Sequence, residues 1–325
     1  MKRLIDKDWE TVISKFTNLG GIAENICQKV GENGRGIFPK DPTKKSRIFI
    51  PKHLLIKRKD VYLDKGYMRI NSNTDYSEEV VEFFHFYQDN FSWGGGGKEI
   101  EEFFENGLKA FPYELKELLR QLGLIDLITR YDCSWDDFIF ETYLSKRRFI
   151  YNHDKLIVPF FELINYLPHS LPLSFSNKGI NHPDIEVSGK EITHHYNYVS
   201  PLTRFLSLGF TCRDVMVFSI PFNLKLKGSD VIIKCKGKSL DENDVKFAKE
   251  NNQIIIPGLP IANLDYKELP INYLLQLSNL LTIKFDTKGF LLEVIDYNIK
   301  ARKDILSKID STHDYPCNIL IDALS

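Results

Sequence analysis

The residues best suited to chemistry lie between Gly189 and Phe210, in the sequence GKEITHHYNYVSPLTRFLSLGF. Tyr196 stands there between a short strand pattern and an apolar helical pattern that ends on Gly-Phe. A tyrosine hydroxyl beside backbone carbonyls supplies oxygen atoms that can orient a reacting amine. Tyr198 lies on the same strand face and competes for this role. The structural alternative is a core or edge tyrosine in an amphipathic strand.

Two upstream segments carry further candidates. The first, ENGRGIF, runs from Glu32 to Phe38 and contains Gly34 and Gly36. Missing side chains let backbone groups approach a ligand, although a GxG sequence usually marks a turn between two strands. The second segment, VPFFELINYLPHS, runs from Val158 to Ser170 and contains Asn165. An asparagine at this position could bind a ligand or cap a turn after a buried strand.

The three segments, in this order, resemble a SET-domain methyltransferase. They are most similar to the Rubisco large-subunit methyltransferase branch, whose pattern reads GRGIF, then VP..DLINH, then GE.V..SYG..SN..LL..YGF. The resemblance implies a protein-lysine N-methyltransferase with S-adenosylmethionine as cofactor and a protein substrate that presents a lysine. A free lysine has a pKa of about 10.4, and only its neutral form attacks a methyl carbon. The sulfonium charge and an apolar channel both lower that pKa, so the enzyme mainly supplies in-line geometry and oxygen acceptors.

The resemblance also implies roles for individual residues. Tyr196 matches the catalytic tyrosine without a gap, because the glycine that leads the strand and the Gly-Phe pair that closes the segment both match. Asn165 matches the asparagine of the family's Asn-His pair, and Tyr166 replaces the histidine. The residues that the resemblance implies in cofactor binding are Gly34, Arg35, Gly36, Lys146, Asn165 and Tyr166.

Two of these cofactor residues have open alternatives. Lys146 stands near the arginine of the family's Ser-Arg-x-Phe motif, where the resemblance implies a contact to the cofactor carboxylate. Arg147 or Arg148 could serve instead, and a solvated helix end is the structural alternative. Arg35 fills the variable middle position of GRG, which commonly points toward solvent.

Several positions depart from the family pattern. Asn197 replaces the glycine after the tyrosine, Pro201 replaces the asparagine of Ser-Asn, and Leu208 replaces the tyrosine of Tyr-Gly-Phe. The resemblance places the position of Leu208 in the lysine channel, so the leucine removes a hydroxyl from it. Phe210 is retained and would supply an apolar wall of the channel, and Tyr198 is a channel or surface residue if it is not catalytic. These departures allow a second hypothesis, a SET-like protein-binding module with weakened or lost catalytic activity.

Length and charge set the broad class of the protein. A chain of 325 residues, 43% of them apolar, can bury a large core in one domain or two. The 43 basic and 44 acidic residues nearly cancel, so no global charge favours DNA, RNA or an anionic membrane as partner. The sequence has no signal-peptide pattern and no membrane-spanning run, so we expect a cytoplasmic protein. Its oligomeric state stays open.

Cysteine and histidine spacing argues against a metal site. The five cysteines are far apart in the sequence, which suits buried thiols in a reducing compartment. The sequence contains no CxC or CxxC motif, the spacing that is typical of a structural zinc cluster. His194 and His195 should point to opposite faces of a strand, and no HExxH motif occurs. The GxSxG, GxxxxGK and dinucleotide-binding fingerprints of other enzyme classes are also missing from the sequence.

The periodicity of apolar residues predicts an α+β protein with a β-rich SET fold of short sheets, a helical insert and a short, mainly helical C-terminal region. The expected parts are 1–76, an N-terminal helix and the first lobe; 77–151, the helical insert; 152–265, the second lobe with the catalytic strand; and 266–325, the C-terminal region. Helices are expected at 4–18, 78–91, 99–111, 114–128, 135–149, 241–252, 269–285 and 291–309.

Overall fold

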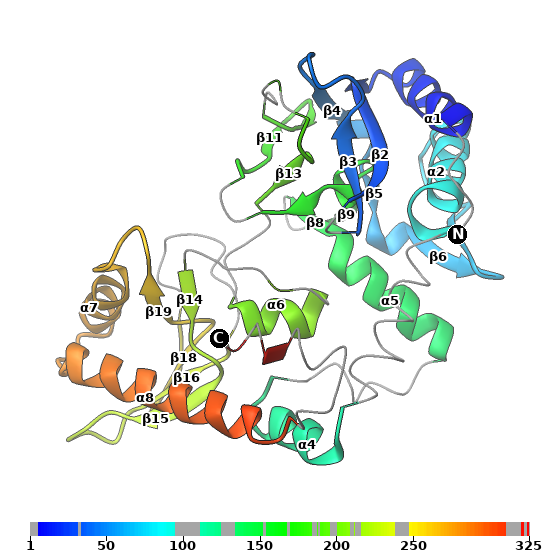
Figure 1. Cartoon of the computed structure of the whole chain (residues 1–325). Helices are drawn as coiled ribbons and strands as arrows, with labels where there is room; N and C mark the ends of the chain where they lie inside the picture. The colour runs from blue at the N-terminus through cyan, green and yellow to red at the C-terminus, as the bar shows by residue number, and fades with distance from the viewer. Residues whose placement is uncertain are drawn as a thin grey trace. The chain divides into compact units, whose positions relative to one another are not determined.

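A computed structural model describes the chain with several gaps (Figure 1). The described residues are 6–31, 34–94, 111–124, 134–151, 154–167, 170–183, 187, 189–195, 200–208, 211, 216–237, 247–309, 320–321 and 324. Helices alternate with short sheets, so the α+β class expected from the sequence is confirmed. The chain divides into two compact units, Met1–Glu101 with Asp132–Tyr196 and Glu102–Tyr131 with Asn197–Ser325. The four-part division stays a prediction.

The first unit combines helices with small sheets. Its helices are α1 (Asp6–Asn18), α2 (Glu78–Asn90) and α5 (Trp135–Arg147), with the 3-10 turns η1 (Lys52–Leu54), η2 (Arg58–Asp60) and η4 (Phe161–Leu163). Its strands are β1 (Ile22–Glu24), β2 (Ile26–Gly31), β3 (Gly34–Pro39), β4 (Arg47–Pro51), β5 (Ile56–Lys57), β6 (Val61–Asp64), β7 (Tyr67–Ile70), β8 (Arg148–Tyr151), β9 (Asp154–Ile157), β10 (Asn165–Tyr166), β11 (Ser174–Ser176), β12 (Gly179–Asn181) and β13 (Thr193–His194).

Strand pairing in this unit joins segments that are far apart in the sequence. The antiparallel sheets have the orders β1-β4-β12-β11 and β5-β9-β8, and β2-β3 and β6-β7 form hairpins. Strand β10 pairs with β13 in parallel. Because β4 pairs with β12 and β5 with β9, the segments on either side of α2 and α5 form one unit.

An aromatic core packs α1 against α2 in the first unit. Trp9, Val12 and Phe16 are buried on one face of α1, as the spacing of an amphipathic helix requires. The Phe16 ring centroid lies 5.6 Å from that of Phe83 on α2 and 4.7 Å from that of Phe160. Aromatic pairs of this kind add about 0.5–1.5 kcal/mol each beyond their buried area. The core thereby anchors the chain just ahead of β10.

The second unit packs two helices against a sheet. Its helices are α4 (Tyr113–Gln121), α6 (Pro201–Leu208), α7 (Leu269–Leu281) and α8 (Thr287–Leu306). Its strands are β14 (Met216–Phe218), β15 (Phe222–Lys225), β16 (Ile232–Cys235), β17 (Ala248–Glu250), β18 (Gln253–Ile256) and β19 (Pro260–Asn263). The sheets have the orders β15-β16-β18-β17 and β14-β19. Ile233 and Ile254 of the larger sheet are buried with Leu274 and Leu277 of α7 and Val294 of α8.

Most expected helices are confirmed, and one is wrong. Helices α1, α2, α4, α5, α7 and α8 fall at the expected places, whereas 99–110 lies outside the described residues. The helix expected at 241–252 is contradicted in its described part, because Ala248–Glu250 forms strand β17 and pairs with β18. Asn251 turns the chain between these strands with φ 53°, a left-handed conformation that asparagine tolerates. Among the described helices, none is long and apolar enough to cross a bilayer.

Candidate functional site

Strands β3, β10 and β13 bring the three sequence segments together in the first unit. Ile37 of β3 forms an antiparallel bridge with Ile192, whose N–H donates to the Ile37 carbonyl at 2.8 Å. Asn165 of β10 lies opposite Thr193 of β13 in a parallel pair. GRGIF, VPFFELINY and the strand that leads to Tyr196 therefore meet, although they are far apart in the chain.

Gly36 lies at the centre of this meeting point. A Cβ atom added to it would lie 2.0 Å from Glu191 Oε1 and 3.0 Å from Asn165 Nδ2. The Asn165 amide donates to Glu191 Oε1 at 2.6 Å and to the Arg35 carbonyl at 3.0 Å. The absent side chain at position 36 thus admits a carboxylate and an amide to the main chain of β3. Glu191 occupies a variable position of the family pattern, so the motifs alone give no signal for it.

Gly34 has a different reason to be glycine. Its φ is 84°, a left-handed conformation, and no heavy atom of another described residue lies within 4 Å of the place where a Cβ would stand. It pairs with Gly31 at the end of the β2-β3 hairpin. The described contacts of Gly34 fit the turn interpretation of the GxG sequence, whereas those of Gly36 fit a close approach of other groups.

Arg35 ties the site to the end of α2. Its Nη1 donates to the Phe91 carbonyl at 3.0 Å, and its Nη2 donates to the Ser92 carbonyl at 3.4 Å. A guanidinium at these carbonyls is favourable, because helix C-termini carry partial negative charge. The variable position of Arg35 suggested a side chain that points to solvent. Its side chain instead binds these two carbonyls. The main-chain carbonyl of Arg35 faces Asn165 instead.

Glu162, three residues before Asn165, is a buried carboxylate that was not among the site residues expected from the sequence. It is 3% exposed, and Gln88 Nε2 of α2 donates to its Oε1 at 2.9 Å. Burial raises the pKa of Glu162, while the charge of Arg147 and the hydrogen bond from Gln88 partly oppose this rise. The family pattern has an acidic residue at this position, which was the available signal.

The neighbours of Glu162 fix the chain that leads into β10. Tyr87 is fully buried, and its hydroxyl accepts from the Phe160 N–H at 2.9 Å. Phe160 has φ 63°, a conformation that costs a non-glycine residue free energy unless its surroundings hold it. Ser92 and Tyr143 make a short hydroxyl contact beside them. This buried polar network joins α2 and α5 to the segment that carries Asn165.

Lys146 and Arg147 lie in the last turn of α5. The Lys146 ammonium is buried, and burial, followed by the neighbouring Arg147 charge, lowers its pKa to about 7. A solvated helix end is therefore the wrong description of Lys146. Arg147 donates to the Glu162 carbonyl at 2.8 Å and lies over the Tyr143 ring at 4.8 Å. Arg148, the other alternative, is exposed at the start of β8.

Tyr166 and the two histidines flank β10 and β13. Tyr166 is buried, and its ring centroid lies 5.6 Å from that of His195. His194 is buried and stacks on Phe149, and burial is the main cause that lowers its pKa to about 3. His194 thus faces the core while His195 is half-buried, in line with opposite strand faces. Within the described residues, no group of three or more His, Cys, Asp or Glu side chains could hold a metal ion.

The proposed catalytic and channel residues fall at the edge of what the structure describes. Tyr196, Tyr198 and Phe210 lie outside the described residues, as does Asn197. Leu208 is the last residue of α6. The described part of the segment that leads to Tyr196 ends on His195, one residue before it.

The structure explains why a proline stands at position 201. It is the first residue of α6, where a missing N–H and a fixed φ suit the start of a helix. Ser200 precedes it, and its Oγ accepts from the Thr203 N–H at 3.1 Å, as an N-cap residue does. Helix initiation thus accounts for the proline that replaces the family's asparagine.

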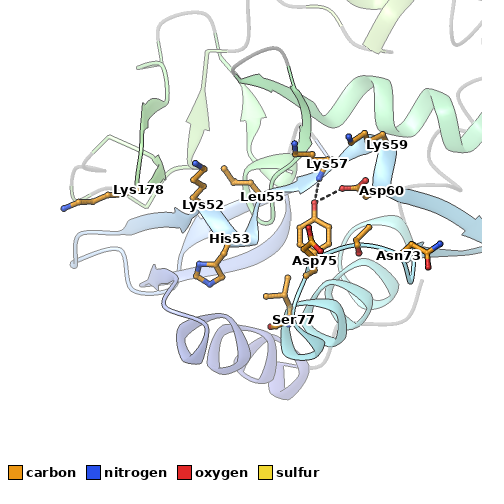
Figure 2. Close-up of a pocket in the computed structure, with 13 residues that line it drawn as sticks. Lys52, His53, Leu55, Lys57, Lys59, Asp60, Asn73, Asp75, Ser77 and Lys178 are labelled. Atoms are coloured by element: carbon orange, nitrogen blue, oxygen red, sulfur yellow. Dashed lines mark hydrogen bonds between the residues drawn. The ribbon is translucent and has the colours of Figure 1, made fainter.

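The first unit also contains a cavity of about 850 Å³, shown in Figure 2. Lys52, Lys57, Lys59 and Lys178 line it together with Asp60. The Tyr76 hydroxyl donates to Asp60 at 3.0 Å and accepts from the Lys57 N–H at 3.0 Å, and burial is the main cause that raises its pKa to about 12. The lining residues come from positions 52–80 and 178, so this cavity is built from residues outside the three motifs.

No protein-family model matches the chain, and no curated protein matches it. The solved structures that are similar to it include the SET domain of LSMT bound to lysine and AdoHcy (16% identity, TM-score 0.40), Rubisco LSMT bound to AdoMet (16%, 0.39), and Rubisco LSMT bound to sinefungin and monomethyllysine (15%, 0.39). These matches cover 70%, 71% and 70% of this chain. They cover 62%, 61% and 61% of those chains, so this chain spans less than two thirds of their length.

Proposed function

We propose that this protein is an S-adenosylmethionine-dependent methyltransferase that acts on a lysine side chain of a protein substrate. The observation that carries the proposal is the meeting of the three motif segments around Gly36, Asn165 and Glu191. The Arg35 carbonyl and the Asn165 amide are hydrogen-bonded across 130 residues of sequence. A GxG turn with only a local role does not require such a partner, whereas a ligand site shared by the motifs does.

The groups around Gly36 fit the amino-acid part of the cofactor. The Glu191 carboxylate and the Arg35 carbonyl are acceptors, and an asparagine amide both donates and accepts. When bound, S-adenosylmethionine supplies a methyl group activated by its sulfonium. We assign cofactor binding to the residues taken from the resemblance and add Glu191 to them: Gly34, Arg35, Gly36, Lys146, Asn165, Tyr166 and Glu191.

The residues after His195 complete the proposed reaction. The Tyr196 hydroxyl orients the lysine amine, and Tyr198, Leu208 and Phe210 form the walls of its channel. Apolar walls disfavour the charged ammonium and favour the neutral amine that attacks the methyl group. We propose a cytoplasmic location, a protein partner that presents a lysine, and no nucleic-acid or membrane partner.

A second candidate function is a SET-like protein-binding module with weakened or lost activity. Two observations favour it. The Asn165 amide is hydrogen-bonded within the protein to Arg35 and Glu191, and Leu208 lacks the hydroxyl that the family has at this position. Such a module would bind the partner protein without transferring a methyl group.

Calorimetry with S-adenosylmethionine on the full chain tests the cofactor site. We expect saturable binding to the wild type and binding weakened at least about tenfold in Asn165→Ala, since that side chain joins the motifs. No binding to the wild type would defeat the enzyme proposal. A labelled-cofactor assay on a whole-cell lysate then distinguishes the two candidates, because a bound cofactor without labelled protein indicates the binding module.

A further inference from the structure

We infer that Glu191 binds the ammonium group of the cofactor's amino-acid part and thereby selects ligands that carry this group. The inference rests on the proposed function and deepens it, because it assigns ligand selectivity to a residue of this chain that the family pattern leaves variable.

The backbone of Glu191 is held by its neighbours. Ile192, the next residue, bridges to Ile37 of β3 with a hydrogen bond of 2.8 Å. Thr193, the residue after that, lies opposite Asn165 in the parallel pair of β10 and β13. The glutamate side chain therefore starts from a backbone anchored on both of the strands that form the site. An anchored side chain loses less conformational freedom when it binds a ligand.

The carboxylate of Glu191 is directed at the main chain of β3. Its Oε1 lies where the side chain of Gly36 would begin, 2.0 Å from an ideal Cβ position, and accepts from the Asn165 amide at 2.6 Å. A hydrogen bond to a charged group is stronger than one between neutral groups, so the amide orients the carboxylate. Gly36 and Asn165 together hold one carboxylate oxygen in a defined place.

The chemistry of this cluster suits a primary ammonium ion. An ammonium has three N–H donors and no acceptor, and it is most strongly bound by a carboxylate with further oxygen acceptors beside it. The Glu191 carboxylate provides the charge, and the Arg35 carbonyl, which has two lone pairs, lies on the other side of the Asn165 amide. A ligand group with negative charge would be repelled at the same place.

Two adenosine ligands separate recognition of the ammonium from support of the fold. S-adenosylhomocysteine contains the amino-acid part, whereas 5′-methylthioadenosine lacks it. We expect Glu191→Gln to weaken S-adenosylhomocysteine binding to the full chain at least about tenfold in calorimetry, because a charge-assisted hydrogen bond is lost. Binding of 5′-methylthioadenosine should stay within about twofold, since its atoms do not reach the glutamate.

Two more variants keep the test informative. Glu191→Asp retains the charge on a shorter side chain and should lose less S-adenosylhomocysteine affinity than Glu191→Gln. Glu24→Gln removes an exposed carboxylate from β1 of the same unit and should leave both affinities unchanged. Thermal unfolding of each variant shows whether it is folded before binding is measured.

Each other outcome contradicts the inference in a distinct way. Equal loss of both ligands in Glu191→Gln would mean that the carboxylate only holds the site together. Tighter binding of both ligands would mean that the carboxylate obstructs the site and must leave it. A wild type that binds neither ligand would overturn the proposed function as well, whereas the first two outcomes overturn the role of Glu191 alone.

Discussion

Glu191 Oε1 occupies the space in which a side chain on Gly36 would begin, with 2.0 Å between the oxygen and an ideal Cβ position. The glycine is therefore required by a residue 155 positions further along the chain, and not by a left-handed backbone as at Gly34. Two motifs thus constrain each other through one contact. This relationship supplies a stability test that is independent of any ligand.

Gly36→Ala should destabilise the first unit by about 1–3 kcal/mol, because the new methyl group must displace the Glu191 carboxylate and disturb the Asn165 amide. Urea denaturation measures the free energy of unfolding. In a Glu191→Ala background the same substitution should cost much less, since the carboxylate is then absent. The difference between the two costs is the coupling energy of a double-mutant cycle.

Gly189→Ala is the matched control for this cycle. A Cβ there would lie 3.4 Å from Pro42 Cβ, close to ordinary contact, so we expect a small change in stability. An equal cost of Gly36→Ala in both backgrounds would show that backbone strain, and not the glutamate, explains the glycine.

Glu162 should make the protein lose stability as the pH rises. Its folded-state pKa is raised, mainly by burial, so the folded protein holds this proton more tightly than the unfolded chain. Stability therefore falls as the pH rises from the ordinary glutamate value of about 4.3 through the raised pKa. Glu162→Gln keeps the shape and can still accept from Gln88, so its stability relative to wild type should improve from pH 5 to pH 8.

Glu82→Gln on the exposed face of α2 is the control for that pH series. It controls for the loss of a carboxylate as such. If Glu162→Gln shows a pH-independent difference from wild type, the buried carboxylate does not hold its proton as described.

His194 should have the opposite effect and make the protein sensitive to acid. Burial is the main cause that lowers its pKa to about 3, so the unfolded chain, with an ordinary histidine pKa of about 6.5, binds the proton more tightly. The resulting stability is present above the unfolded value and is lost as the pH falls. Between pH 7 and pH 5 the loss is about 2 kcal/mol, and His194→Gln should remove it.

The exposed His53 provides the comparison. His53→Gln removes an imidazole from the surface and controls for the loss of a histidine as such. Parallel slopes for His194→Gln and wild type in denaturation at pH 5, 6 and 7 would contradict the assignment of His194 as an acid-sensitive group.

Several helices of this protein could be predicted from the sequence, because the periodicity of their apolar residues is a local pattern. Apolar residues at helical spacing located α1 and α2, because one face of each helix is buried. The same reasoning failed at Ala248–Glu250, where Asn251 adopts a left-handed turn and folds β17 back onto the strand that follows it, β18. The helical spacing of apolar residues does not reveal that a tight turn at Asn251 will make the segment a hairpin strand.

The candidate site was predictable to the extent that motifs mark it. Gly36 and Asn165 were selected from the sequence, and the structure brings them together. Glu191 and Gln88 were not selected, because the significance of each depends on a partner far along the chain. Lys146 was assigned to a solvated helix end as an alternative, but its burial depends on packing that no periodicity encodes.

Tyr196→Phe should abolish methyl transfer and leave the affinity for S-adenosylhomocysteine within about twofold of the wild type, because the proposed role of the hydroxyl is to orient the amine and not to bind the cofactor. Loss of one such oriented group typically costs a factor of about 10² or more in rate. Labelled-cofactor transfer and calorimetry measure the two quantities. Tyr198→Phe is the matched control and should retain turnover. Retained turnover in Tyr196→Phe together with its loss in Tyr198→Phe would transfer the catalytic role to Tyr198.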